Sequence, residues 1–544
     1  MKSRDPIVQQ LVSKGSPFEI ATVDGINCFA NAPQTLDALI ETARRFNDRT
    51  FIVEGEERFS FADVLARRDA LAAVLDVNPG DRIAICMKNR SEWLIGFLAA
   101  VRVGAVVALI NSRGSGEELS DAISSVEASL VLADKDRADR LRTAGYDGRI
   151  IEAEEYPLEG SYDGHGAEIG PDDPAVILFT SGTTGRVKGA VLSHRNVITG
   201  IMSVQMAGTI VLHNKAKELG MPVEQLMAAV PQQSMLLVYP LFHISGLGAS
   251  FLSPLLAGSK LVIMERWDPV EAVRLIEQEG ITMFTGVPTM LWDLLNSAAL
   301  EGADLSSVTN IGMGGQALPI NLLDSMREAC PHSVMGTGYG LTETAGSVAM
   351  ALGADFIRKR DSAGRVMPLV ETKIVDSDGQ EVPEGEAGEI VVRGAQVMLG
   401  YWGLDEETRA VLDDEGWFRT GDVGRIDDEG YLYIVDRKKD MVISGGENIY
   451  CAEVERVLSE VEGVVECATF GIPDARLGEL LVAVVRGDQI TEDAVKTHVG
   501  GRLARYKTPG IVRIVSTPLP RNDLGKIDKM KLRQGWSTEN EETA

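Results

Sequence analysis

Cysteine is scarce in this chain. Five occur in 544 residues and none forms a CxxC pair; they are Cys28, Cys86, Cys330, Cys451 and Cys467. Because they are scattered and odd in number, they argue against a disulfide framework and against a zinc site. We therefore expect a protein of a reducing compartment, the cytoplasm.

Positive charge is also in short supply. The chain carries 53 Lys and Arg against 80 Asp and Glu, which gives a formal net charge of −27. Nucleic-acid binding normally needs a basic face, so we expect no DNA or RNA partner. An anionic ligand would have to be held by local backbone donors, lysines or a metal ion, because the overall field repels it.

Long apolar runs are missing as well. The longest, Phe97 to Ile110, is interrupted by Arg102 and is too short to span a bilayer. The start of the chain, Met1 to Pro6, does not lead into the apolar segment of a secretory signal. The sequence therefore predicts no transmembrane segment.

The chain does have enough apolar residues for several cores. Hydrophobic residues make up 44% of it, and its length exceeds the roughly 250–300 residues at which a single core stops growing. In the first half, helix and strand patterns alternate, as in parallel α/β layers. After about Glu371, short strands and turns dominate. The polar run Asp436 to Asp440 resembles a linker to a small α/β region.

These patterns predict an α/β protein with two parts. Residues 1–437 would form a large composite N-terminal domain of two layered α/β subdomains and a β-rich subdomain. Residues 438–544 would form a small α/β C-terminal domain. Helices are expected over 33–46, 61–75, 92–103, 223–230, 269–279, 451–459 and 491–503. Strands are expected over 50–53, 58–60, 82–87, 105–110, 260–264, 282–285, 372–376, 389–393, 431–435, 464–470 and 480–485.

One loop points to phosphate binding. An apolar strand, Ala175 to Phe179, runs into Thr-Ser-Gly-Thr-Thr-Gly-Arg-Val-Lys-Gly, residues 180–189. Glycines allow close backbone approach to phosphate, exposed N–H groups form an anion nest, and a lysine adds mobile charge. The lysine spacing differs from a Walker A loop. We favour a phosphate cradle over a plain surface loop, with contacts from Thr180, Ser181, Gly182, Thr183, Thr184, Gly185 and Lys188.

This loop resembles the phosphate loop of the adenylate-forming superfamily, which contains acyl-CoA synthetases, aryl-CoA ligases, peptide-synthetase adenylation domains and luciferases. The other motifs make the chain most similar to the AMP-forming acyl-CoA ligases. The resemblance extends from about Thr35 to Arg533. It implies a mobile C-terminal domain and a reaction that uses ATP, Mg²⁺ and coenzyme A, the last as co-substrate. It also places Thr184 among the catalytic residues.

A second glycine-rich segment, residues 336–346, is similar to the family's second signature. The resemblance implies a ring face for adenine at Tyr339, flanked by Gly338 and Gly340, and a hydroxyl for the α-phosphate at Thr342. Glu343 would be the metal ligand and a catalytic residue, because a carboxylate oxygen suits Mg²⁺.

A third segment, Ile311-Gly-Met-Gly-Gly-Gln-Ala317, fits a dinucleotide fingerprint by its glycine spacing, which is a weak signal alone. No acidic residue fills the ribose-binding role in a following βαβ unit. The family resemblance instead places Gln316 and Ala317 against the nucleotide.

Later motifs complete the expected nucleotide site. By resemblance, Asp422 and Arg437 contact the ribose hydroxyls, and Lys439 is the hinge between the domains. Gly445 and Gly446 would let the slender arm of coenzyme A pass close to the backbone.

Two further residues are expected at the reacting centre. Lys526 matches the family lysine that bridges the acid carboxylate and the α-phosphate, where a compact ammonium stabilises developing charge. His243 matches a gate between the acyl pocket and the thiol tunnel; a lone histidine is more often a packed residue. No Ser-His-Asp or Cys-His constellation is visible.

The acid itself is not specified by these motifs. The expected acyl pocket has no charged group; its members are Phe242, Val287, Met290, Met313, Thr337, Ala345 and Met350. Methionines favour a bulky, adaptable apolar acid, and fatty, aryl and polycyclic acids all stay open. The segment from Val211 to Val238 is longer than in typical relatives and borders the acid-entry side.

The sequence predicts a two-step acid–CoA ligase with a carboxylic acid, ATP and CoA as small-molecule partners. Three alternatives share the ATP motifs: an adenylation enzyme that loads a carrier protein, a luciferase-like oxidative enzyme, and an ATP-binding regulatory module without activity. A homo-oligomer is compatible with the sequence.

Overall fold

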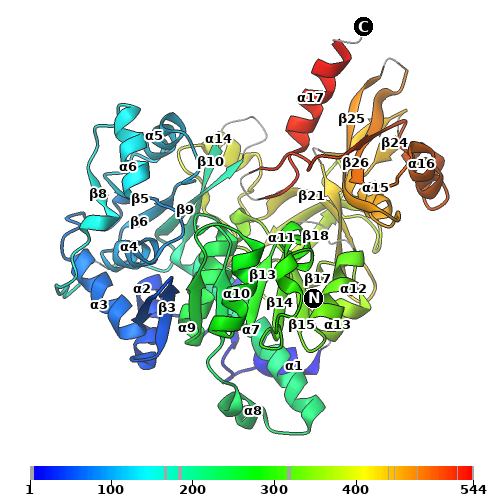
Figure 1. Ribbon diagram of the computed structural model, residues 1–544. Helices are drawn as coiled ribbons and strands as arrows, with labels where there is room; N and C mark the ends of the chain where they lie inside the picture. Colours follow the sequence, from blue (N-terminus) through cyan, green and yellow to red (C-terminus); the bar gives the residue numbers. More distant parts are fainter. Residues whose placement is uncertain are drawn as a thin grey trace.

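The computed structural model describes residues 5–164, 168–181, 187–314, 320–438, 440–445, 447–474, 476–522 and 525–541 (Figure 1). Within these ranges the strands form a two-stranded, a five-stranded, a seven-stranded and a thirteen-stranded sheet. Helices cover the two largest sheets, so the expected α/β class is confirmed.

The seven-stranded sheet holds the strand that enters the phosphate loop. Its parallel strands are β5 (Arg82–Cys86), β6 (Val106–Leu109), β7 (Leu130–Ala133), β8 (Ile150–Glu152) and β9 (Pro174–Ser181). Antiparallel β10 (Val187–Ser193) and β20 (Gly400–Tyr401) extend one edge. The longest apolar run of the sequence is therefore a core helix, α4 (Ser91–Arg102), followed by β6, and both are buried.

The thirteen-stranded sheet joins two regions that the sequence separates. Its parallel part consists of β3 (Thr50–Glu54), β11 (Ser234–Leu237), β12 (Lys260–Ile263), β13 (Met283–Gly286), β14 (Asn310–Gly314) and β15 (Val334–Tyr339), with β4 (Glu57–Ser60) antiparallel at the edge. The expected β-rich region continues it through β16 (Ala349–Leu352), β17 (Gly364–Val366), β18 (Glu371–Val375), β19 (Gly388–Arg393), β21 (Phe418–Ile426) and β22 (Tyr431–Arg437). The β17–β22 pairing makes the region an extension of the α/β sheet.

The C-terminal region has a sheet and core of its own. Strands β23 (Val442–Ser444), β24 (Glu447–Ile449), β25 (Val464–Asp474), β26 (Gly478–Gly487) and β27 (Ile511–Val515) pack with α15 (Cys451–Leu458), α16 (Glu492–Gly500) and α17 (Lys529–Glu541). The sequence predicts no helix after residue 503, but the basic end forms α17, which projects at the top of Figure 1. Asp436 and Arg437 were expected in a linker, yet they belong to β22 because their backbones pair with β21.

Helix α7 (His194–Leu219) is the longest described helix. Ser193 caps its start through a reciprocal bond with Asn196, and Gly220 ends it with a φ of +65°. Its length and composition would allow a membrane crossing, but 56% of its most apolar window is buried inside the fold, as in a core helix. The expected extra helix is confirmed as α8 (Val223–Ala229). However, Val211 to Leu219 extends α7 rather than forming a separate insertion.

The remaining elements cover the sheets and connect them. The remaining helices of the first half are α1 (Pro6–Leu11), α2 (Leu36–Glu41), η1 (Thr42–Phe46), α3 (Phe61–Ala72), α5 (Gly116–Ser125), α6 (Lys135–Thr143) and η2 (Ala153–Glu155). Later come η3 (Ser245–Leu252), α9 (Ser253–Ala257), α10 (Pro269–Glu279), α11 (Pro288–Leu295), η4 (Ala298–Leu300), α12 (Ile320–Ala329), η5 (Thr342–Thr344), α13 (Ala354–Arg358), α14 (Asp405–Arg409) and η6 (Arg505–Lys507). The hairpin β1 (Ile20–Val23) and β2 (Ile26–Phe29) lies near the N-terminus.

Candidate active site

One large cleft brings together residues from distant parts of the chain. The described residues that line it and that the sequence predicts are Thr180, Lys188, His243, Gly338, Gly340, Thr342, Glu343, Asp422, Arg437 and Lys526. They come from the ends of β9, β10 and β15, from the segment before η3 (Ser245–Leu252), from η5, from β21 and β22, and from the turn before α17. The fold therefore brings most of the predicted site residues that the structure describes into one cleft.

At one end of the cleft, three polar side chains hold one another. The Tyr339 hydroxyl donates to Asp422 Oδ2 at 2.7 Å, and Arg437 Nε lies 3.3 Å from Asp422 Oδ1. Asp422 and Arg437 are cross-strand partners in β21 and β22, which fixes their proximity. Burial, and then the charge of Asp422, hold the pKa of Tyr339 well above its usual range. The Asp422 carboxylate is thus buried but fully engaged.

Glu343 lies beside a tyrosine that the sequence analysis missed. The Tyr401 hydroxyl donates to Glu343 Oε1 at 3.0 Å, and the Lys188 ammonium lies 5.0 Å from the centre of the Tyr401 ring. Burial raises the pKa of Glu343, while the Tyr401 hydrogen bond acts in the opposite direction. Tyr401 enters the site because β20 pairs with β10, a contact between strands about two hundred residues apart in sequence. The Gly400-Tyr401-Trp402 run carries no local signal for this pairing.

Lys526 reaches the cleft from the C-terminal region. It lies on a tight turn closed by a β-bridge between Arg521 and Ile527. Burial lowers its pKa to about 8; the nearby charge of Arg437 acts in the same direction and that of Asp422 opposes it. The C-terminal lysine is therefore close to the charged pair of the large region.

His243 also lines the cleft, near Lys526. Burial lowers its pKa to about 3, and the positive charges of Arg113 and Lys526 add to this effect. Among the described residues, its Nε2 is buried and has no hydrogen-bond partner. The imidazole is neutral near pH 7 and offers one polar atom at the boundary of an apolar region.

Comparisons with known proteins agree with this geometry. The family described as AMP-binding enzyme matches residues 39–402, and the AMP-binding enzyme C-terminal domain matches residues 453–526. The chain belongs to the AMP-binding enzyme family. The second match ends at Lys526, the residue that the fold brings to the cleft.

Three proteins illustrate the relationship. A feruloyl-CoA synthase of Amycolatopsis sp is 35% identical, with 91% of this chain and 97% of that protein covered. A 3-[(3aS,4S,7aS)-7a-methyl-1,5-dioxo-octahydro-1H-inden-4-yl]propanoyl:CoA ligase of Mycobacterium tuberculosis is 33% identical, with 94% and 99% covered. The crystal structure of ATP-bound MatB from Rhodopseudomonas palustris superposes with a TM-score of 0.78 at 29% identity, covering 91% and 99%. The expected family, the AMP-forming acyl-CoA ligases, is confirmed, and with it the class of acid–thiol ligases.

Most of the side chains expected to form the acyl pocket line the cleft, and none of those that do is charged. Of the expected acyl pocket, Phe242, Val287, Met313, Thr337 and Met350 line the cleft, whereas Met290 and Ala345 are not among its lining residues. Ala345 is buried at the end of η5, with a φ of +48°. The segment after His243 is a π-helix, η3, a rare form that occurs frequently at functional sites, and its residues Ser245 and Ala249 line the cleft.

Helix α7 also lines the cleft, through residues such as Gln205 and Leu212. The segment from Val211 to Val238, which the sequence shows to be longer than in typical relatives, therefore contributes to the wall of the cleft.

Several predicted residues fall outside the described part of the chain, namely Gly182, Thr183, Thr184, Gly185, Gln316, Ala317, Lys439 and Gly446. Ser181 ends β9, and Gly445 lies in the turn between β23 and β24 with a φ of +62°. Gly445 and Tyr339 are not among the described residues that line the cleft.

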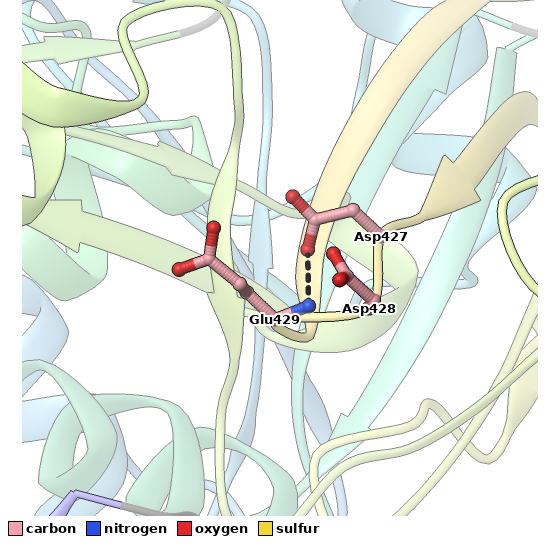
Figure 2. Close-up of side chains that lie close together, drawn as sticks. All are labelled: Asp427, Asp428 and Glu429. Carbon is pink, nitrogen blue, oxygen red and sulfur yellow. Dashed lines mark hydrogen bonds between the residues drawn. The ribbon is translucent and has the colours of Figure 1, made fainter.

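An acidic group elsewhere could be mistaken for the metal site. Asp427, Asp428 and Glu429 lie together in the turn between β21 and β22, where the Glu429 N–H donates to Asp427 Oδ1 at 3.0 Å (Figure 2). Lys359 contacts Asp427 at 3.0 Å and Glu429 at 2.8 Å, so these charges already have a cationic partner. The expected metal ligand, Glu343, is not part of this group.

Proposed function

We propose that this chain activates an apolar carboxylic acid as its acyl-adenylate with ATP and transfers the acyl group to coenzyme A. The observation that supports this most strongly is the position of Lys526, which the small C-terminal region brings into the cleft that Asp422, Arg437 and His243 also line. Neither region alone contains these groups, so the two regions together form the reaction centre.

In the first step, a carboxylate oxygen attacks the α-phosphorus of ATP, the α–β anhydride bond breaks and pyrophosphate leaves. Asp422 accepts the ribose hydroxyls and Arg437 supports it, while Tyr339 presents its ring to adenine. Thr342 donates to the α-phosphate, and Lys188 with the loop 180–185 holds the outer phosphates. Lys526 aligns the carboxylate with the phosphorus, so catalysis rests on positioning and electrostatics.

The residues at Glu343 fit a divalent cation. The carboxylate is buried, faces the cleft and lies near Lys188 at the phosphate end, and hard oxygen ligands suit Mg²⁺. When bound, Mg²⁺ would neutralise charge that develops on the phosphate oxygens. Glu343 would hold the cation, and the Tyr401 hydroxyl orients the carboxylate for it.

In the second step, the thiolate of coenzyme A attacks the acyl carbonyl carbon, the carbon–oxygen bond to phosphate breaks and AMP leaves. The part from residue 438 onward would rotate about Lys439, which withdraws Lys526 and brings the Gly445–Gly446 turn to the cleft. One cleft thereby serves two half-reactions through domain rotation. His243 would guard the passage between the acid and the thiol.

The acid is apolar. The cleft walls beyond His243 carry aromatic, aliphatic and methionine side chains, and none of Phe242, Val287 or Met350 offers a partner for a second charge. The names of the two relatives specify an aryl and a polycyclic acid, which supports a ring-containing substrate here. Because all five cysteines are free thiols and ATP and CoA are abundant in the cytosol, we place the reaction in the cytoplasm.

The proposal is tested with a panel of fatty, aryl and polycyclic acids incubated with ATP, Mg²⁺ and CoA. Mass spectrometry should show AMP and one acyl-CoA thioester, both dependent on the added acid. Lys526→Ala should reduce acid-dependent AMP formation by about 100-fold or more, since it removes a charge that acts in the transition state. It should spare thioester formation from supplied acyl-adenylate, whereas Lys439→Pro should show the reverse pattern. Equal loss in both half-reactions would contradict this division of labour.

A further inference from the structure

The carboxylate of Glu466 anchors the turn that carries Lys526. Glu466 lies on β25 with its side chain only 9% exposed. It accepts the backbone N–H of Leu519 through Oε2 at 3.1 Å, and its Oε1 bonds to the guanidinium of Arg521. A single buried acid therefore fixes the chain just before the turn and the first side chain of the turn itself.

Arg521 also binds the backbone next to the lysine. Its second guanidinium nitrogen donates to the carbonyl oxygen of Gly525, directly before Lys526, at 2.7 Å. The planar guanidinium can make both bonds at once in a fixed geometry, which an ammonium cannot. Three further bonds close the described part of the turn: Lys526 N donates to Asn522 Oδ1 at 3.1 Å, Asn522 N to Lys526 O at 2.8 Å, and Gly525 N to Asn522 O at 2.9 Å.

The position of the turn matters because it enters the large region. A Cβ atom added at Gly525 would lie 3.7 Å from Val287 Cγ2, a residue of the acid wall. Gly525 also has a φ of +78°, a conformation that glycine adopts without strain. The turn therefore sits against the acid wall and depends on its own anchor for the direction in which Lys526 points.

We propose that Arg521, anchored by Glu466, is a positioning residue that sets the place of the Lys526 ammonium during adenylation. This role rests on the proposed function of Lys526. Arg521 and Glu466 both belong to the small region, so their contact would travel with that region when it rotates. The contact between Glu466 and Arg521 should therefore affect the rate of adenylation, in which Lys526 acts. It should not affect the attack of a thiol on the finished acyl-adenylate.

Arg486 provides a matched control. It is the cross-strand partner of Glu466 and contacts the other carboxylate oxygen at 3.1 Å, with 31% of its side chain exposed. Among the described residues, no bond joins Arg486 to the turn. Arg486→Ala therefore removes an equal charge from the same carboxylate without loosening Lys526 directly.

The first experiment compares half-reactions. Because small displacements of a positioning group can cost up to about 100-fold in rate, we expect Arg521→Ala to lower acid-dependent ATP–pyrophosphate exchange by about 30-fold. The KM for ATP and the rate of thioester formation from supplied acyl-adenylate should each change by about twofold at most. Arg521→Lys should also lose most of the exchange rate, because an ammonium cannot replace the planar guanidinium that bonds both Glu466 and Gly525. The exchange rate of Arg486→Ala should stay within about twofold of wild type.

A double variant tests whether Arg521 acts through the lysine. In a Lys526→Ala background, Arg521→Ala should cause no further loss of exchange, because the group it positions is absent. An independent loss of similar size in that background would overturn the proposal. So would equal effects of Arg521→Ala on both half-reactions, or a loss in Arg486→Ala as large as that in Arg521→Ala.

A second measurement does not depend on catalysis. Lysines are reductively methylated with ¹³C-formaldehyde, and Lys526→Ala identifies the signal of Lys526 in the NMR spectrum. The pKa of that amine, lowered by burial to about 8, should rise towards the ordinary value in Arg521→Ala and stay unchanged in Arg486→Ala. An unchanged pKa of Lys526 in Arg521→Ala would refute the positioning role of Arg521. Absence of acid-dependent AMP formation by wild-type protein would instead refute the proposed function, and this titration would still decide on Arg521.

Discussion

The two ends of the cleft are built in different ways. At the nucleotide end, polar groups hold one another before any ligand arrives, as Asp422 does with Tyr339 and Arg437. At the end proposed for the acid, the side chains expected to contact it are uncharged, and His243 Nε2 has no hydrogen-bond partner among the described residues, although the charges of Arg113 and Lys526 act on its ring. Paired polar groups fix a geometry, whereas neutral walls fix only a volume. The comparison teaches that one end is organised for a constant ligand and the other for a variable one.

The largest effect is expected from breaking the organised end. Asp422→Ala should raise the KM for ATP by about 100-fold, because it removes the proposed acceptor of two ribose hydroxyls and leaves Tyr339 and Arg437 without their shared partner. Steady-state kinetics with ATP varied would measure this. Asp427→Ala, in the turn of the same hairpin, is the control and should leave the KM for ATP unchanged. A KM for ATP that barely responds to Asp422→Ala would remove this residue from the site.

A smaller effect is expected at the metal end. Tyr401→Phe deletes the hydroxyl that donates to Glu343, and a hydrogen bond to a charged group contributes about 1.5–3 kcal/mol. We expect the Mg²⁺ concentration needed for half-maximal ATP binding to rise about tenfold, measured by titrating binding of a fluorescent ATP analogue. Tyr433→Phe removes a comparable bond, to Asp427, and should leave the Mg²⁺ dependence unchanged. Equal effects of the two variants would show that Tyr401 has no special role.

At the end proposed for the acid, a substitution should change the choice of acid rather than the binding of ATP. Met350→Ala enlarges the cleft next to β15 and should alter the ratio of kcat/KM between a small and a bulky acid by about tenfold, the lower end of the effect of one methylene in a pocket. The KM for ATP should stay within about twofold of wild type. Met326→Ala, on α12 and not among the described residues that line the cleft, serves as control for methionine loss and should change neither quantity. An effect on ATP binding as large as that on acid choice would contradict the separation of the two ends.

The contrast also explains what could be predicted from sequence. Asp422, Arg437, Glu343 and Lys526 sit in short local motifs, so each was recognised from its neighbours, and the fold does bring them to one cleft. Tyr401 was missed because its contact with Glu343 depends on the β10–β20 pairing between distant segments.

The acid walls were harder to predict. Five of the seven expected members line the cleft, but the π-helix η3 and the length of α7 were not foreseen. Helix bounds in the regular layers were close, as for α10 at Pro269–Glu279. The C-terminal helix α17 was missed because its sequence is mostly polar and lacks a strong apolar face.

The smallest expected effect concerns how the acid wall is tied to the core. His194, the first residue of α7, is buried, and its Nδ1 accepts the backbone N–H of Leu36 at 3.0 Å. Burial lowers its pKa to about 4. The unfolded chain therefore takes up a proton on this histidine before the folded protein does. The stabilisation by His194 is complete above about pH 6.5 and is lost as the pH falls towards 4.

Replacing the histidine should flatten this dependence. In His194→Gln, an amide oxygen can still accept the Leu36 N–H but does not titrate. Between pH 7 and pH 5, wild type should lose about 1–2 kcal/mol more unfolding free energy than His194→Gln, measured by urea denaturation. His332→Gln is the control, since His332 lies in the exposed turn before β15 and should not alter the slope. Parallel pH profiles for wild type and His194→Gln would contradict this account, because they would mean that the pKa of His194 is the same in the folded and unfolded chain and that its bond to Leu36 adds no pH-dependent stability.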